Sequence, residues 1–130
     1  MSRLHEFLDR RQRVPFRWGA NDCALVAADA VLEQTGKDPA EGLRGQWGDE
    51  RQALALIARL GGLEAIATSA LGDPLPEPLR AQMGDVGLVQ WNSRECLAVC
   101  NGPAWVLPCT RGLGLLPLDC ARLAWRVARG

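Results

Sequence analysis

The stretch PFRWGANDCAL, residues 15–25, decides how this chain folds. A Trp-Gly pair leads through Asn21 and Asp22 into Cys23, where a run with helical spacing of apolar residues begins. The first turn of a helix carries unpaired backbone N–H groups and the positive end of the helix dipole, and both favour thiolate over thiol. Cys23 is therefore a candidate nucleophile, provided that a base lies beside it.

The residues after Cys23 repeat at the spacing of one helix face. Asn21 or Asp22 is expected to cap this helix, and Gly36 is expected to end it. The predicted buried stripe consists of Cys23, Val26, Ala27, Ala30 and Val31. Cys23 is thus both the candidate nucleophile and the first residue of the helix face that we expect to be buried.

Three further helices are predicted around this one. The first begins at a Ser2 cap and runs to about residue 13. Residues 40–49 are poor in apolar side chains and indicate a loop, which two more helices follow at about 50–60 and 63–71. Gly72 is expected to close the last helix.

The character of the chain changes after a proline-rich connection at 73–78. Short apolar runs follow at 86–91, 96–100, 105–107, 113–116 and 123–127, separated by turn residues. This spacing is typical of an antiparallel sheet. The sequence therefore predicts an α+β fold. We expect one domain over 1–130, with a helical half at about 1–72 and a sheet half at about 84–128.

The charge balance excludes several classes of function. Fifteen basic and fifteen acidic residues cancel, and the pI is about 6.6. Neither a phosphate-binding loop nor a nucleotide fingerprint is present, so we expect no nucleic-acid partner and no cofactor.

No apolar run is long enough for a signal peptide or a membrane span, so we expect synthesis in the bacterial cytoplasm.

The cysteines do not form a recognisable framework. There are five, an odd number, and none is in a C-x-x-C pair, so reduced thiols are expected. Cys96 and Cys100 would lie on one face of a strand, where buried small side chains are the ordinary interpretation. No metal site is predicted, although the pattern leaves open whether Cys96, Cys100 and Cys109 bind a metal.

Several short motifs, in this order and spacing, resemble the NlpC/P60 superfamily of papain-like cysteine peptidases. They are Trp18-Gly19, Asp22-Cys23, Gly84-Asp85-Val86 before the first strand, and a second strand that ends at Gly102. Residues 15–29, GKDPA at 36–40 with Arg44-Gly45, and AWRV at 124–127 more narrowly resemble a small NlpC/P60-like family. Phages and prophages encode that family, often among tail genes.

The resemblance implies a catalytic role for Cys23, in which its thiolate attacks an amide of peptidoglycan peptides. A histidine at the start of the second strand would be the base, and a further polar residue would orient it. Cys96 occupies that position here, and strand 105–107 offers no polar orienting residue. A thiol cannot replace imidazole as a base, because its ordinary pKa is about two units higher.

Two other bases are conceivable. His5, the only histidine, could approach from the first helix. A carboxylate from Asp22, Asp85 or Glu95 could instead act on a thiol already acidified by the helix. Asp22 is more simply a helix cap and Asp85 a turn residue. Without a base, Cys23 is a small apolar side chain at the start of a buried stripe.

The aromatic residues add candidates for binding. Trp18 is expected to pack over the helix start, and Trp18, Gly19 and Asp85 are candidate binding residues. Trp91, Trp105 and Trp125 lie in predicted strands, where we expect core packing. An exposed tryptophan among them would indicate a protein interface.

The resemblance implies a phage tail protein located in the virion. The expected role is structural or in assembly at the tail tip or hub, as a pseudoenzyme that contacts other tail proteins. Two alternatives remain open: an active cysteine peptidase or amidase that opens peptidoglycan during genome delivery, and a non-catalytic binder of cell-wall peptide.

Overall fold

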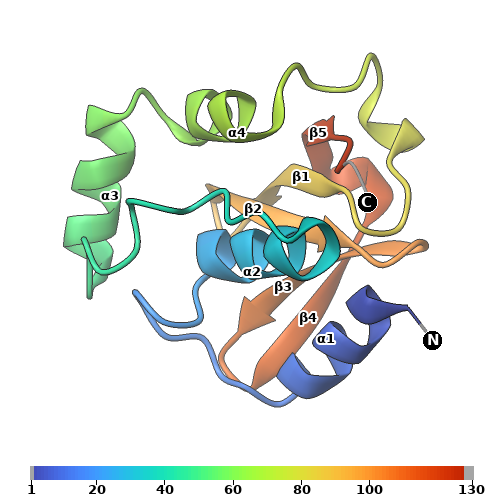
Figure 1. Cartoon of the computed structure of the whole chain (residues 1–130), viewed down its shortest axis with the longest axis horizontal. Helices are drawn as coiled ribbons and strands as arrows, with labels where there is room; N and C mark the ends of the chain where they lie inside the picture. The colour runs from blue at the N-terminus through green and yellow to red at the C-terminus, as the bar shows by residue number, and fades with distance from the viewer. Residues whose placement is uncertain (1, 128–130) are drawn as a thin grey trace.

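The computed structural model describes residues 2–127 and confirms the predicted α+β class. Within these residues four α-helices precede a five-stranded sheet (Figure 1). The helices are α1 (Arg3–Arg11), α2 (Cys23–Thr35), α3 (Glu50–Arg59) and α4 (Leu63–Leu71). The helical half therefore matches the prediction closely, although α1 ends two residues before the expected residue 13.

The sheet is antiparallel throughout and has the order β4-β3-β2-β1-β5. Its strands are β1 (Val86–Trp91), β2 (Arg94–Cys100), β3 (Ala104–Cys109), β4 (Gly112–Pro117) and β5 (Ala121–Trp125). Two short 3₁₀ helices, η1 (Pro78–Arg80) and η2 (Leu118–Cys120), precede β1 and β5. The first and last strands thus pair with each other, with β5 at one edge of the sheet and β4 at the other.

Local sequence explains the ends of these elements. The Asp22 side chain accepts a hydrogen bond from the backbone N–H of Leu25, and Gly36 adopts a left-handed conformation with φ of 77°. Asn92 and Ser93 also have positive φ, which suits a two-residue hairpin turn. That tight turn pairs Trp91 with Arg94, so β2 begins two residues earlier than predicted.

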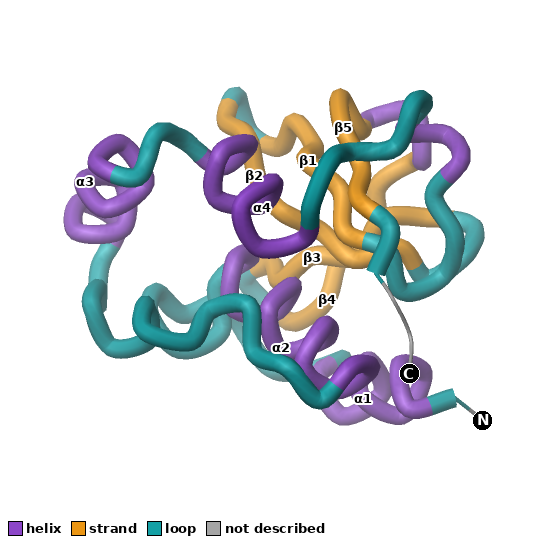
Figure 2. The backbone as a smooth tube through the Cα atoms, turned by 45° about the horizontal axis from the view of Figure 1, so that its top comes forward, coloured by secondary structure: helices purple, strands orange, loops and turns teal. Residues whose placement is uncertain are grey.

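Buried side chains form clusters on both faces of the sheet, and Figure 2 shows the backbone of the helices and strands that carry them. On one face α1, α2 and α4 pack against a cluster that includes the fully buried Trp125. The other face carries Cys96, Cys100 and the fully buried Trp105. The predicted core packing of these two tryptophans is confirmed, as is the shared strand face of the two cysteines.

A buried carboxylate joins the beginning of the sheet to its end. Asp85 is fully buried and accepts hydrogen bonds from the backbone N–H groups of Gln82 and Val127. It also pairs with Arg126 at 2.9 Å. Asp85 therefore holds the turn before β1 against the residues that follow β5.

The lengths of the helices in residues 2–127 bear on whether a helix could cross a membrane. No single helix there has the length and apolar character that crossing a membrane requires. Only α3 and α4 taken together meet those criteria, and they are bent by 66° at the break between them.

Candidate functional site

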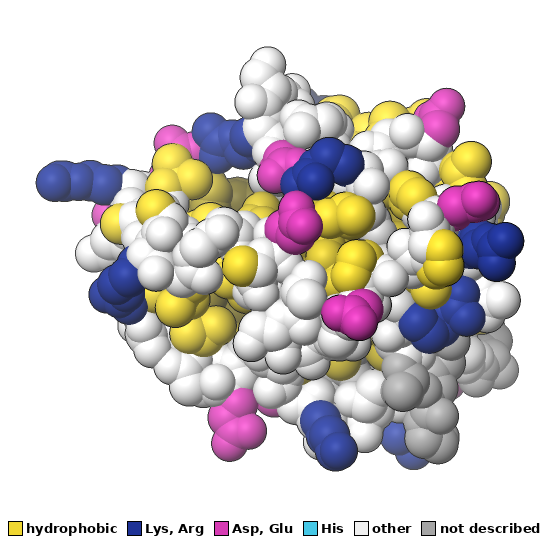
Figure 3. Space-filling view, turned by 90° about the horizontal axis from the view of Figure 1, so that it is seen from above, with side chains coloured by type: hydrophobic (Ala, Val, Ile, Leu, Met, Phe, Trp, Pro, Cys, Tyr) yellow, Lys and Arg dark blue, Asp and Glu magenta, His cyan; other side chains and the backbone are white. Residues whose placement is uncertain are grey.

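A cleft of about 490 Å³ lies where the start of α2 meets the sheet and α3. Cys23, Cys96 and Cys109 line it from α2, β2 and β3, and apolar residues of α3 and α4 line it from the other side. Figure 3 shows hydrophobic side chains around a hollow on the left, where α3 lies in Figure 1. The candidate nucleophile therefore faces a mostly apolar cleft.

Asp22 fixes the backbone on which Cys23 sits. It is only 2% exposed, and its Oδ1 accepts from the Leu25 N–H at 3.0 Å. Its Oδ2 accepts from the Gly19 N–H at 2.9 Å and from the indole Nε1–H of Trp47 at 2.7 Å. The predicted capping role is confirmed, and both carboxylate oxygens are engaged in structural hydrogen bonds.

Gly19 permits the close approach of the loop that carries Trp47. Its φ is 77°, and a Cβ added at this position would collide with the carbonyl oxygen of Trp47. Gly19 is therefore required by the packing of the 41–48 loop against the turn before α2.

The Cys23 thiol lies against strand β2. Its S–H donates a hydrogen bond to the sulfur of Cys96, and its sulfur accepts one from the backbone N–H of Leu97. The two thiols thus touch at the position where the resemblance implies a cysteine–histidine pair. Cys96 is 6% exposed, whereas Cys23 is half-buried.

The expectation that the helix start would acidify Cys23 is wrong. Its pKa is raised by the hydrogen bond to Cys96, by burial and by the charge of Asp22. The hydrogen bond from Cys23 instead lowers the pKa of Cys96, and the charge of Arg94 acts in the same direction. These local contacts outweigh the helix dipole, whose effect is of the order of 1 kcal/mol.

The family assignment rests on a match that spans both halves of the fold. A family model described as "Domain of unknown function (DUF6950)" matches residues 1–127. The chain belongs to the DUF6950 family. No curated protein matches it, and no solved structure does. The cleft of this DUF6950 domain must therefore be interpreted from its own residues.

The other candidate bases are placed differently in the DUF6950 domain. His5 lies on the exposed side of α1 and does not line the cleft. Asp85 does not line the cleft either, and its Oδ1 accepts a hydrogen bond from the backbone N–H of Val127. Glu95 does line the cleft, but it pairs with Arg122 at 2.8 Å.

The cleft rim is rich in tryptophan. Trp18, Trp47 and Trp91 all line the cleft, and Trp18 also packs edge-on against Phe16. Trp91 is 37% exposed, so the prediction that it packs in the core is wrong. The reason is its position at the end of β1, directly before the hairpin turn, where it belongs to neither of the two buried clusters of the sheet.

Helix α3 forms a wall with exposed apolar residues. Leu54 is 50% exposed and Leu60 is 39% exposed, and both line the cleft. Glu50, in the first turn of α3, forms an ion pair with Arg94 at the start of β2. This ion pair links α3 to the sheet across the cleft.

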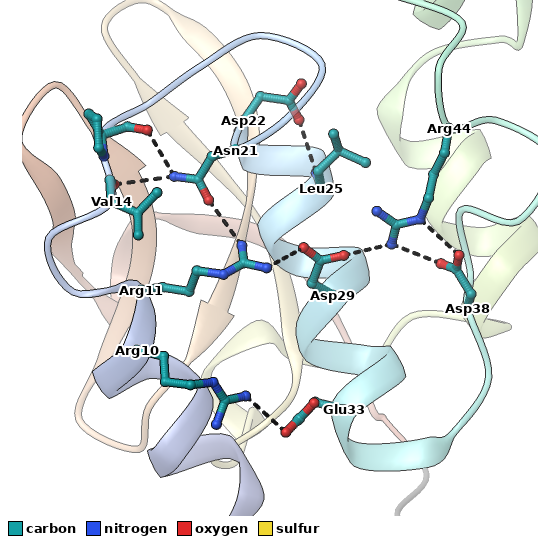
Figure 4. Close-up of polar contacts among 11 residues, drawn as sticks. Arg10, Arg11, Val14, Asn21, Asp22, Leu25, Asp29, Glu33, Asp38 and Arg44 are labelled. Carbon is teal, nitrogen blue, oxygen red and sulfur yellow. Dashed lines mark hydrogen bonds and ion pairs between the residues drawn. The ribbon is translucent and has the colours of Figure 1, made fainter.

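A charged network holds the loop after α2 (Figure 4). Asp29 of α2 pairs with Arg11 and with Arg44, each at 2.7 Å, and Arg44 also pairs with Asp38 at 2.8 Å. The hydrogen bonds and charge of Arg44 lower the pKa of Asp38. The ion pair between Arg44 and Asp29 therefore holds the first part of this loop against α2. The hydrogen bond from Trp47 to Asp22 holds its later part.

Three cleft residues were not predicted from the sequence to lie beside Cys23. Trp47 lies in a predicted loop, and its one signal was a large aromatic side chain among polar neighbours. Cys109 and Arg94 face the cleft only because β2 and β3 pair beside each other. Residues 2–127 contain no group of three metal-ligating side chains, so Cys96, Cys100 and Cys109 form none.

Proposed function

We propose that this DUF6950 domain is a structural or assembly component of a phage tail, with a degenerate NlpC/P60-like fold. In this proposal the apolar cleft holds a segment of another tail protein. The observation that carries the proposal is the partner of Cys23, a second thiol in a mostly apolar cleft. The phage context comes from the sequence resemblance.

The environment of Cys23 supports a role without hydrolysis. A nucleophilic cysteine requires a base within hydrogen-bond reach and an accessible thiolate. Here the contact is Cys96, and burial together with Asp22 raises the pKa of Cys23. The chain's one histidine does not line the cleft. These features disfavour an active peptidase or amidase.

The chemistry of the cleft favours a protein segment as its occupant. Aromatic anchors contribute most of the binding energy in protein interfaces, and Trp18, Trp47 and Trp91 lie together here. Peptidoglycan peptides carry free carboxylates, which a cationic site would recognise. Arg94 lines the cleft but is paired with Glu50. An apolar segment therefore suits the cleft better than a cell-wall peptide.

Muropeptide hydrolysis tests the degenerate character of the site. We expect no cleavage by the wild type or by Cys23→Ala. The Cys96→His variant places an imidazole beside Cys23, and we expect its Cys23 to be alkylated by iodoacetamide at neutral pH faster than in the wild type. Cleavage by the wild type that Cys23→Ala abolishes would show the proposal to be wrong.

Co-purification with tail proteins of a phage or prophage that encodes this domain tests the role of the cleft. Leu54→Arg and Trp91→Ala should each weaken binding at least tenfold, because each alters an exposed apolar residue of the cleft. Leu115→Arg is the matched control, since Leu115 is 66% exposed and lies outside the cleft. Equal losses in all three variants, or binding of muropeptides but not of tail proteins, would contradict this role.

A further inference from the structure

The two thiols that meet in the cleft come from distant parts of the sequence. Cys23 begins α2, and Cys96 lies in β2 on the sheet face that carries Trp105. Cys23 packs against the buried cluster that contains Cys96, and it is hydrogen-bonded to the Cys96 side chain and to the backbone N–H of Leu97. Helix α2 and strand β2 therefore keep the two side chains next to each other.

The cleft gives a small reagent access to this pair. Cys23 and Cys96 both line it, and its volume of about 490 Å³ is large enough for a small thiol compound. Of the three remaining thiols, one also lines this cleft and two do not. Cys109 lines the same cleft, Cys100 is fully buried, and Cys120 is half-buried in η2 outside the cleft.

We propose that Cys23 and Cys96 are a redox-active dithiol, which a low-molecular-weight disulfide such as oxidised glutathione converts into an intramolecular disulfide. This proposal does not depend on the proposed function. It follows from the placement of the two thiols, because Cys23 packs against the buried cluster that contains Cys96, the two side chains are hydrogen-bonded, and both line one cleft.

The reaction balances as two successive thiol–disulfide exchanges. The Cys96 thiolate attacks one sulfur of the oxidant, forms a mixed disulfide and releases the first reduced thiol. Cys23 then loses its proton and attacks the Cys96 sulfur, which releases the second reduced thiol. The protein loses two electrons and two protons, and the disulfide bond of the oxidant is reduced.

The contacts also suggest which thiol reacts first. Cys96 accepts the hydrogen bond from Cys23 and has Arg94 nearby, and both effects lower its pKa. Thiolate character governs the rate of the first exchange. Cys23, with its raised pKa, is suited to resolve the mixed disulfide once its hydrogen-bond acceptor has reacted.

The test is to equilibrate the reduced full chain with oxidised glutathione and then map its disulfides by mass spectrometry. The expected product has one Cys23–Cys96 disulfide and three alkylatable thiols. Its thermal midpoint should rise by about 5–10 °C, because the bond closes a long loop of the unfolded chain. Five unmodified thiols, a stable glutathione adduct or a Cys96–Cys109 disulfide as the main product would each overturn the proposal.

Two variants sharpen this result. Cys109→Ser should still form the Cys23–Cys96 disulfide, whereas Cys23→Ser should stop at a glutathione adduct on Cys96. Cys120→Ser is the control for a thiol outside the cleft. Disulfide mapping of the wild type decides the proposal even if Cys23→Ser fails to fold.

Discussion

The two walls of the cleft differ in how their apolar residues are used. The wall formed by α2 and the sheet rests on side chains that are almost fully buried, among them Trp105 and Asp22. The wall formed by α3 buries only Ala53 and Leu56 and exposes Leu54 to solvent. The first wall holds the fold together, whereas the exposed apolar side of the second contributes little to stability. Such surface is typical of binding sites.

The largest expected loss of stability comes from a substitution at Gly87, a residue of the sheet in the wall formed by α2 and the sheet. A Cβ at Gly87 would come within 2.6 Å of the Trp105 ring, so Gly87→Ala forces this buried ring to move. We expect a loss of about 3 kcal/mol in the free energy of unfolding, measured by urea denaturation. A loss below about 1 kcal/mol would show that the packing around Trp105 tolerates added volume as easily as the exposed side of α3 does.

The helix caps of the two walls give a matched pair. Asp22→Asn places an amide N–H₂ opposite the donors of Gly19 and Trp47, and should cost about 2 kcal/mol of stability. Asp49→Asn alters an exposed cap of α3 with a bond to Gln52, and should cost about 0.5 kcal/mol or less. Urea denaturation of both variants measures the difference. Equal losses would remove the proposed distinction between the walls.

The pH dependence of stability reports on the loop that joins the walls. Arg44 holds the pKa of folded Asp38 below its unfolded value, so the folded state binds fewer protons. The resulting stability is present at neutral pH and is lost as the pH falls through the folded pKa. Because Asp38 is near solvent, we expect less than about 1 kcal/mol. Asp38→Asn should reduce the loss of stability between neutral and acidic pH in urea denaturation, and an unchanged loss would contradict this assignment.

The smallest effect on stability is expected at the exposed side of α3. Leu54→Arg should change the free energy of unfolding by less than about 0.5 kcal/mol, because the side chain is half-exposed. Thermal denaturation measures this change. A large loss of stability would mean that Leu54 supports the fold and is not an unused binding surface.

The sequence predicted local structure well because its signals are local. The Asp22 cap, the Gly36 end of α2 and the Asn92-Ser93 turn each act within a few residues. The alternation along β2 likewise placed Cys96 and Cys100 on one face.

The candidate site was less predictable because it depends on contacts between distant segments. The third donor to Asp22 comes from Trp47, and the pKa of Cys23 is governed by Cys96. Neither contact can be predicted from the spacing of apolar residues along the sequence. The exposure of Trp91 has the same origin, since it depends on which elements cover the end of β1.

The buried Asp85 has a consequence for synthesis on the ribosome. Its carboxylate is satisfied in part by Arg126 and Val127, and β1 needs β5 as its second neighbour. A nascent chain that has emerged only as far as β4 therefore has β1 with one open edge, and it has the Asp85 carboxylate without the cation that accompanies its burial. The sheet should become stable only after residue 127 leaves the exit tunnel, which makes the final folding step late and cooperative.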